Sequence, residues 1–252
     1  MKLTFLGTSH GVPAADRYCS SAMLQVADRT YLIDAGAPVA DLLQRYGVPF
    51  SAVKAVFTTH IHGDHTFGLP ALCDLAGWYF KDADFDVFLT EQVGIDALHA
   101  FVMATSKNFD DDRVRLRLVQ PGTFYDDGTL RVTAVPTRHM DYGTQQYPSY
   151  AYVLEAEGKR LIFTGDLHGP DAADFPAPAL ELPSEAVVCE MAHFGGEAVF
   201  PYLKCCPTGR VLFHHVFHDY EQSMADIAAA GRPEDGWCCP VDAVADGDVF
   251  EF

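Results

Sequence analysis

The stretch TTHIHGDH at residues 58–65 constrains the fold of this chain more than any other feature. Its side chains include four that commonly bind metal ions, namely His60, His62, Asp64 and His65. Apolar segments lie on both sides of it, so burying these ionisable groups without a partner would be costly. The stretch therefore predicts a metal site at the end of a buried strand.

The spacing inside the motif suits more than one ion. His60 and His62 are two positions apart on extended backbone, where such side chains point to the same side, so both imidazoles can reach one ion. Gly63 permits a sharp turn, after which Asp64 and His65 begin a helix and can face a second ion. Further ligands are then expected at the ends of other strands.

Other strand-like segments do end in metal-binding residue types. LRVTAVPTRH ends at His139, LIFTGD ends at Asp166, and RVLFHHV contains both His214 and His215. A carboxylate has two oxygens, so Asp166 is suited to bridge two ions. The residues alone leave open which of the two late histidines is the ligand.

The hydrophobic pattern predicts strands alternating with helices, without a linker. The predicted strands are 3–7, 22–27, 30–36, 52–59, 85–90, 113–119, 130–137, 149–156, 160–166, 186–192 and 210–216. The predicted helices are 38–47, 65–80, 91–107, 196–206 and 220–231. EGK at 157–159 predicts a hairpin turn, and the proline-rich segment 174–183 predicts a surface loop. The aromatic residues expected mostly in the core are Phe67, Trp78, Tyr79, Phe80 and Tyr147.

Charge and cysteine content limit the partners and the compartment. The formal net charge is −18 at pH 7, and an acidic surface repels nucleic-acid phosphates and anionic membranes. Bulk nucleic-acid binding and membrane binding are therefore not expected. The chain shows no secretory signal and no apolar run of membrane-spanning length, so a cytoplasmic location is expected. The seven cysteines include no CxxC pair and are predicted to be reduced and mostly buried.

The order HxHxDH, then His139, then Asp166 in a Gly-Asp pair, then a late histidine resembles the metallo-β-lactamase superfamily. The similarity spans nearly the whole chain, including YLIDAG before the motif and VADGDVFEF at the end. It implies an α/β fold, a four-layered αββα metallo-β-lactamase sandwich, in a single domain over residues 1–252.

The resemblance also implies a ligand set. It assigns the first ion to His60, His62 and His139, and the second to Asp64, His65 and His215, with Asp166 bridging. The family's late histidine follows the position that His214 occupies here, so His215 is taken as the ligand and His214 as its support. Asp34 is similar to the family's buried aspartate that orients the metal loop.

The N-terminal segment FLGTSHGVPAADRYCSS narrows the branch. It is similar to the opening of ribonuclease Z and its phosphodiesterase relatives, which have a glycine-rich turn, here residues 7–13, and a basic residue soon after, here Arg17. HGDHTFGLPAL also resembles the ribonuclease Z form of the metal motif. The resemblance implies a phosphodiester substrate, and because dimers are common in that family, a homodimer is a candidate assembly.

Two departures from ribonuclease Z argue for a smaller substrate. That enzyme carries a long arm that grips tRNA between the third histidine and the bridging aspartate, whereas here only residues 140–165 lie there, as a predicted tight hairpin. Its His-Glu-Ala-Thr segment corresponds to CEMAH at 189–193, where the histidine is displaced. A cyclic nucleotide or a small substrate derived from nucleic acid is therefore expected.

The resemblance implies two divalent ions, with zinc as the default, and the His and carboxylate donors also suit manganese or iron. Two such ions can share a water and lower its pKa, so that a bridging hydroxide attacks phosphorus. Asp64 is predicted to take part in catalysis. His193 is the predicted general acid, with His168, His214 and His218 as alternatives.

Three other functions stay open. The same metals could serve a hydrolase of carboxylic esters, thioesters or lactones. A ribonuclease Z-like endonuclease acting at RNA 3′ ends is the second alternative. The third is a non-catalytic protein that uses the metal-bound fold as a binding module.

Overall fold

The computed structural model describes residues 1–12, 14–169, 171–217, 219 and 221–252. It divides into two compact units: unit 1 comprises Met1–Val119 and Asp246–Glu251, and unit 2 comprises Gln120–Ala245 with Phe252. The predicted single domain over 1–252 stays a prediction. The candidate acid His218 and the predicted helix start at Tyr220 lie outside the described residues.

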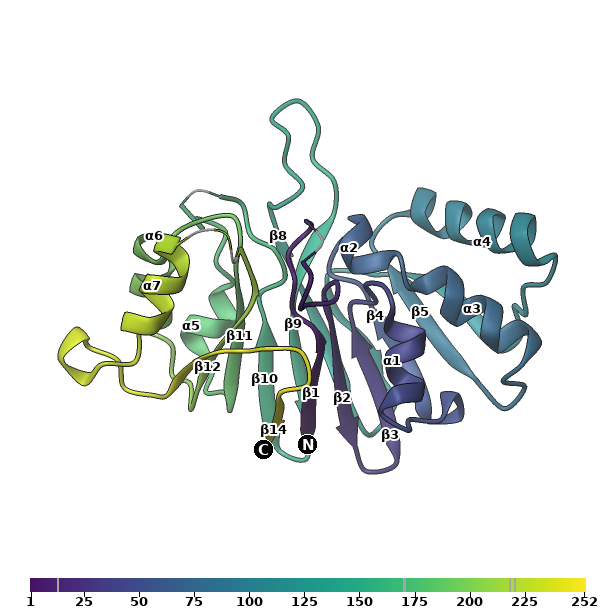
Figure 1. Cartoon of the computed structure of the whole chain (residues 1–252), viewed down its shortest axis with the longest axis horizontal. Coiled ribbons are helices and arrows are strands. Elements are labelled where there is room, and N and C mark those ends of the chain that lie inside the picture. Colours follow the sequence, from purple (N-terminus) through teal and green to yellow (C-terminus); the bar gives the residue numbers. More distant parts are fainter. Residues whose placement is uncertain (13, 170, 218, 220) are drawn as a thin grey trace. The chain divides into compact units, whose positions relative to one another are not determined.

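Unit 1 contains a mixed sheet with helices against one face (Figure 1). Its strands are β1 Lys2–Gly7, β2 Ser21–Val26, β3 Arg29–Ile33, β4 Val53–Phe57, β5 Phe85–Leu89, β6 Val114–Leu118 and β14 Val249–Glu251. Its helices are α1 Val39–Arg45, η1 Phe50–Ala52, α2 Gly63–Thr66, α3 Leu69–Trp78 and α4 Gln92–Ser106. Across the described part of the chain, the sheet order is β14-β1-β2-β3-β4-β5-β6. The last strand of the chain therefore pairs with the first.

The core of unit 1 lies between this sheet and its helices. Leu42 and Leu43 of α1 and Leu72 of α3 pack with Leu32 of β3 and Val56 of β4, and all of them are buried. Burying an aliphatic side chain of this size contributes about 1.5–3 kcal/mol, so this core fixes the strands that lead into the metal motif.

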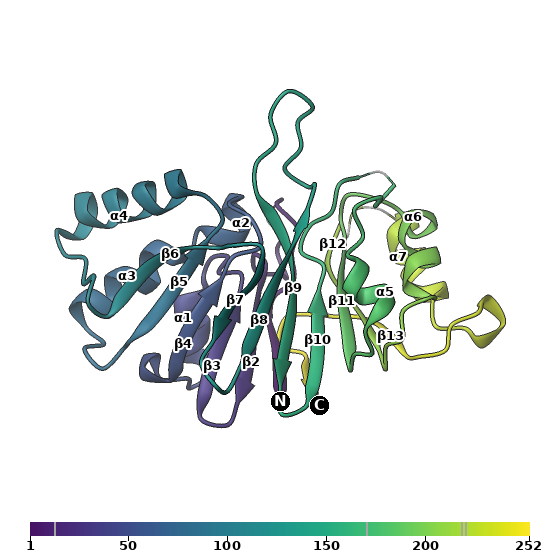
Figure 2. The same ribbon diagram turned by 180° about the vertical axis from the view of Figure 1, so that it is seen from behind.

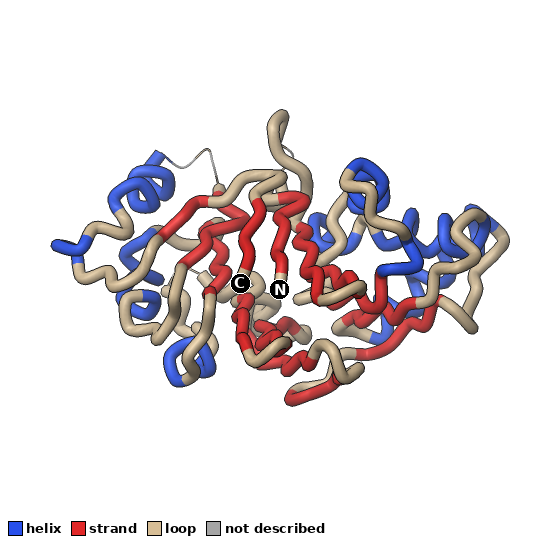
Figure 3. The backbone as a smooth tube through the Cα atoms, turned by 90° about the horizontal axis from the view of Figure 1, so that it is seen from below, coloured by secondary structure: helices blue, strands red, loops and turns tan. Residues whose placement is uncertain are grey.

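Unit 2 contains a second mixed sheet (Figure 2). Its strands are β7 Gly122–Asp126, β8 Arg131–Thr137, β9 Ser149–Ala156, β10 Lys159–Phe163, β11 Ala186–Met191, β12 Val211–Val216 and β13 Val241–Ala243. Its helices are α5 Ala177–Glu181, α6 Gly196–Leu203, α7 Glu221–Ala229 and η2 Pro233–Asp235. Its order over the described residues is β13-β12-β11-β10-β9-β8-β7. Figure 3 shows the helices in blue and the strands in red.

The core of unit 2 joins its parallel strands to α5, α6 and α7. Val187 and Phe213 of β11 and β12 pack with Val199 of α6 and Ile227 of α7. The strand β11 is buried along its whole length, as is usual for a central parallel strand. Glu190 is the one charged residue of this buried strand, and its side chain has no exposed surface.

Most predicted elements are present, and the predicted EGK turn is confirmed. Ala156 pairs with Lys159, and Glu157 and Gly158 both have positive φ, at 53° and 74°, as a two-residue hairpin turn requires. The single helix predicted for 65–80 is wrong. It is divided into α2 and α3, because the Gly68 backbone N–H donates to the Ala35 carbonyl oxygen at 2.8 Å and not to the preceding helical turn.

Other local predictions were incomplete. The loop predicted for 174–183 contains the short helix α5, since proline is compatible with the first turn of a helix. The strands β7, β13 and β14 were missed. The last two have only three residues each, too few to show a period, and β7 is polar and partly exposed.

Two burial predictions also need correction. Among the cysteines, which are all free, only Cys73 and Cys189 are buried, whereas Cys205 and Cys238 are exposed. The core role expected for the aromatic residues is wrong for Phe67, Trp78 and Tyr79, which are 72%, 51% and 74% exposed. No helix within the described residues is both long enough and apolar enough to cross a membrane.

Candidate metal centre

In unit 1 the metal motif follows the carboxyl end of a parallel strand. β3, β4 and β5 run parallel, so the residues that follow β3 and β4 meet at one edge of the sheet. Asp34 follows β3, and His60 follows β4 after two threonines. This topology explains why Asp34 lies beside a motif that begins only at residue 58.

The buried Asp34 carboxylate holds the metal motif in place. Its Oδ1 accepts a hydrogen bond from the Thr59 backbone N–H at 2.7 Å, and its Oδ2 lies 2.8 Å from Nδ1 of His65. Asp34 has φ of +58°, in a left-handed conformation that aspartate tolerates better than most residues. This backbone conformation thus directs the Asp34 carboxylate toward Thr59 and His65 of the metal motif.

These contacts also fix which ring nitrogens can bind metal. The Thr59 hydroxyl is 3.1 Å from both Asp34 oxygens and 3.0 Å from Nδ1 of His60, so it donates to Asp34 and accepts from His60. The Nε2 atoms of His60 and His65 then carry the lone pairs. Outer hydrogen bonds of this kind orient metal-ligating histidines in general.

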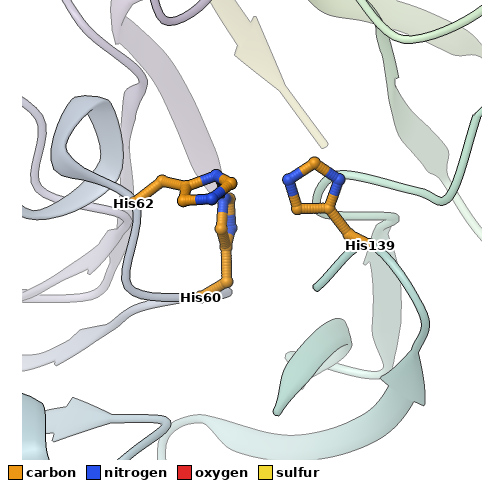
Figure 4. Close-up of side chains that lie close together, drawn as sticks. All are labelled: His60, His62 and His139. Atoms are coloured by element: carbon orange, nitrogen blue, oxygen red, sulfur yellow. Dashed lines mark hydrogen bonds between the residues drawn. The ribbon is translucent and has the colours of Figure 1, made fainter. Parts of the chain in front are cut away.

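The donor atoms of unit 1 are close enough to share ions. Nε2 of His60 lies 2.9 Å from Nδ1 of His62, and Nε2 of His65 lies 3.3 Å from Oδ2 of Asp64. Ligands bound at 2.0–2.1 Å in tetrahedral geometry lie about 3.3 Å apart. Figure 4 shows the His60 and His62 rings nearly edge to face, and it also draws His139 of unit 2.

Unit 2 repeats this arrangement, since β10, β11 and β12 are parallel and each leads into a candidate residue. Asp166 follows β10, and its Oδ2 lies 3.2 Å from Nε2 of His215 and 3.7 Å from Nε2 of His139. The Nδ1–H of His139 donates to the Leu167 carbonyl oxygen at 3.2 Å. Burial lowers the pKa of His139 although Asp166 opposes this shift, and the lowered pKa favours the neutral ring, whose Nε2 can bind metal.

A β-bulge decides which late histidine faces Asp166. The register between β11 and β12 pairs Glu190 with His214 but Met191 with Val216, so His215 is the extra residue. Its φ of +53° turns its side chain away from the regular alternation. His214 stays in register, with its ring centroid 6.3 Å from that of Phe163.

Glu190 supports the neighbouring loops of unit 2. Its carboxylate accepts hydrogen bonds from the backbone N–H groups of Leu167, at 2.9 Å, and Ala192, at 2.7 Å. Its Oε1 also lies 2.9 Å from Nδ1 of His193. The donor atoms of His193, His139 and Asp166 lie within 4.8 Å of one another, so the predicted general acid belongs to the same cluster as two predicted ligands.

Sequence reasoning gave no role to several residues that organise the site. These are Thr59, Glu190 and Asp174, whose carboxylate accepts from the backbone N–H groups of Arg138 and His168 beside the predicted ligands. A signal did exist for Glu190, because an acidic residue inside the apolar run AVVCEM requires a buried partner.

In each unit the donor atoms, their burial and their outer hydrogen bonds suit a divalent ion. Imidazoles with fixed tautomers and carboxylates suit zinc, and also manganese or iron. The residues present therefore fit the ions that the sequence implied. The complete ligand sets draw on both units, and they remain predictions.

Two mixed sheets with helices, and histidine and aspartate side chains gathered near the ends of their strands, place the chain in the metallo-β-lactamase superfamily. The chain belongs to the family described as "Anti-Pycsar protein Apyc1", whose model matches residues 1–173.

Curated relatives identify the branch. The chain is 35% identical to the ribonuclease Z of Microcystis aeruginosa over 141 residues, which are 55% of this chain and 44% of the relative. It is 30% identical to the ribonuclease Z of Methanothermobacter thermautotrophicus over 163 residues, 65% of this chain and 50% of the relative. The chain thus spans about half the length of the curated relatives it matches. The predicted ribonuclease Z and phosphodiesterase branch is confirmed.

Solved structures confirm the predicted fold class. The metallo-β-lactamase fold protein YhfI from Bacillus subtilis matches with a TM-score of 0.75 and 19% identity, covering 99% of both chains. The short form of human tRNase Z matches with a TM-score of 0.74 and 17% identity, covering 100% of this chain and 99% of that one. Yeast PDE1 matches with a TM-score of 0.73 and 12% identity, covering 98% of both.

Proposed function

We propose that this hydrolase is a phosphodiesterase that cleaves a small diester, such as a cyclic nucleotide, at a centre with two divalent ions. The observation that carries the proposal is the pair of buried donor clusters, each with its ring nitrogens fixed by outer hydrogen bonds. The names of the relatives, ribonuclease Z and PDE1, support a phosphodiester as substrate.

The proposed ligands are His60, His62 and His139 for one ion and Asp64, His65 and His215 for the other, with Asp166 between them. When bound, the ions supply an activated water and neutralise charge on the phosphoryl oxygens. Zinc is the proposed metal, and manganese or iron suits the same donors.

The protein itself supplies proton transfer and orientation. His193 is proposed to protonate the leaving oxygen through Nε2, because Glu190 accepts from its Nδ1–H and stabilises the charged ring. Asp64 is proposed to hold a proton of the attacking water as well as to bind metal. Asp34 is proposed to orient the His65 ring by accepting a hydrogen bond from the Nδ1–H of His65. His214 is proposed to support the bulge at His215, because it pairs with Glu190 at the neighbouring register position.

The substrate is proposed to be small. The segment between His139 and Asp166 is a short loop with a bridge between Asp141 and Gln146, followed by the β9–β10 hairpin. This segment is too short to form the long tRNA-gripping arm that ribonuclease Z carries at the same place. The net charge of −18 also disfavours long nucleic acids. The free thiols suit a reducing compartment, so we place this activity in the cytoplasm.

The proposal is tested by hydrolysis of bis-p-nitrophenyl phosphate, with p-nitrophenyl acetate measured alongside. Metal-reconstituted protein is expected to cleave the diester, and a chelator or the His62→Ala substitution should remove this activity. A screen of cyclic and linear nucleotides would follow. Metal-dependent cleavage of the acetate alone would favour the ester hydrolase, and cleavage of precursor tRNA alone would favour the endonuclease. Tight metal binding with no hydrolysis would favour a binding module.

We also propose that the chain forms a homodimer through unit 1. A groove of about 870 Å³ between α3 and α4 is lined by Phe67, Val93 and Phe101, which are 72%, 61% and 55% exposed. Of α4, only Leu98 and Val102 are buried within the described structure. Among the described residues that line the groove, Asp74 is the one with a charged side chain. Two copies of this strongly acidic chain can therefore approach each other here without strong repulsion.

Light scattering is expected to give twice the chain mass for the native protein and the chain mass for Phe101→Glu, because a buried carboxylate would oppose association. Met224→Glu, at a 37% exposed position of α7, is the matched control and should remain dimeric. A monomeric native protein at micromolar concentration would contradict this assembly.

A further inference from the structure

Asp246 lies near the end of the chain and closes a turn at its beginning. Its Oδ1 accepts from the Thr8 backbone N–H at 2.8 Å and from the Thr8 hydroxyl at 2.7 Å. Its Oδ2 accepts from the Tyr18 backbone N–H at 2.6 Å. One carboxylate therefore joins the two arms of the segment between β1 and β2, within unit 1.

The arms also contact each other directly. The backbone N–H of Ser9 donates to the Tyr18 carbonyl oxygen at 2.9 Å, and Arg17 donates to the Thr8 hydroxyl at 3.0 Å. A Cβ at Gly7 would lie 1.9 Å from the Cys19 carbonyl oxygen, so only glycine allows this approach. The carboxylate of Asp246 accepts hydrogen bonds from the Thr8 and Tyr18 backbone N–H groups at the neck of the turn, beyond the last paired residues of β1 and β2.

The tip of the turn lies against a proposed metal ligand. A Cβ built on Gly11 would be 3.4 Å from Oδ2 of Asp64 and 3.8 Å from its Oδ1. A side chain at position 11 would thus already be in van der Waals contact with this carboxylate, so the Gly11 Cα lies within one carbon–carbon bond of such contact and bounds the space beside Asp64. The contact involves residues that are distant in sequence, and Asp246 holds the turn that makes it.

We infer that Asp246 is a positioning residue. It keeps the Thr8–Val12 turn beside Asp64, and the turn in this place holds the Asp64 carboxylate in the position in which it would bind the second ion. The inference rests on the proposed metal role of Asp64, and it does not depend on which substrate is cleaved. Residues that orient a metal ligand from outside commonly contribute about 10–100-fold in metal affinity.

Asp246→Asn tests the inference, because it keeps the shape but places an amide N–H₂ against one of the three donors. Zinc affinity would be measured by competition with a chromogenic chelator, and exchange of backbone amides in residues 8–12 by mass spectrometry. We expect one of two zinc ions to bind about 10-fold or more weakly, with the other unchanged, and faster exchange in the turn. Asp242→Asn is the matched control, because Asp242 forms an ion pair with Arg210 in unit 2.

Thr8→Val provides a milder second variant, because it removes only the hydrogen bonds of the Thr8 hydroxyl, to Asp246 and from Arg17, and leaves Asp246 with its two backbone donors. Its effect on zinc affinity should be smaller than that of Asp246→Asn, and the double variant should show less than the product of the two effects. Equal weakening of both ions, or unchanged affinity and exchange, would overturn the inference. Failure to cleave any phosphodiester would overturn the proposed function alone, since zinc affinity and amide exchange do not require turnover.

Discussion

Replacing His193 with alanine is expected to slow cleavage of a cyclic nucleotide by about 10²–10⁴-fold while leaving release of p-nitrophenolate nearly unchanged. The ribose alkoxide is a poor leaving group and needs a proton, whereas p-nitrophenolate departs without one. The structure gives His193 a means to act as this acid, because the buried Glu190 lies 2.9 Å from its Nδ1 and favours the protonated ring. Steady-state kinetics on the two substrates would measure the ratio.

His168→Ala is the control for this prediction. Its ring was an alternative candidate for the acid, and its backbone N–H is held by Asp174 in the same region. This variant should retain most activity on both substrates. If His193→Ala slowed both substrates equally, His193 would act in metal binding or folding and not as a general acid.

Replacing Glu190 with alanine is expected to lower the free energy of unfolding by about 3–5 kcal/mol. The substitution leaves the backbone N–H groups of Leu167, Ala192 and His193 without their acceptor, and of these three hydrogen bonds the one from Leu167 is fully buried and the other two are partly buried. Leaving one such donor unsatisfied costs about 1–3 kcal/mol. Urea denaturation followed by circular dichroism would measure the change, and cyclic nucleotide cleavage should fall as well, because His193 loses its partner.

Glu185→Ala is a suitable control, because Glu185 is exposed just before the same strand, β11, and should change stability by less than about 0.5 kcal/mol. Glu190→Gln should lie between the two, since one oxygen acceptor remains. An unfolding free energy for Glu190→Ala within 1 kcal/mol of the native value would show that water or a neighbouring group replaces the carboxylate.

Much of the fold could be predicted because its signals are local. Most of the parallel strands in both units are short runs rich in apolar residues, and the motif at 58–65 follows one of them. Elements that depend on tertiary contacts were not predictable in the same way. The break between α2 and α3 results from the hydrogen bond of the Gly68 backbone N–H to the Ala35 carbonyl oxygen, which no helical periodicity encodes.

The candidate site shows the same division. The predicted ligands in the compact motif were accessible because their residue types are clustered in sequence. The roles of Thr59, Glu190 and Asp174 were not, because each depends on which backbone groups the fold brings within hydrogen-bonding distance. The choice between His214 and His215 came from family resemblance, and the register shift now gives a physical reason for it.

The bulge at His215 has a consequence for how this chain can vary. Because the extra residue in β12 sets the direction of the imidazole, the length of the strand matters as much as its composition. Deleting one residue upstream would restore regular alternation and carry a histidine to the opposite face of the sheet. Insertions and deletions in β12 should therefore be tolerated far less than substitutions of its apolar residues, and a histidine on an unbulged strand would not reproduce the position of His215 beside Asp166.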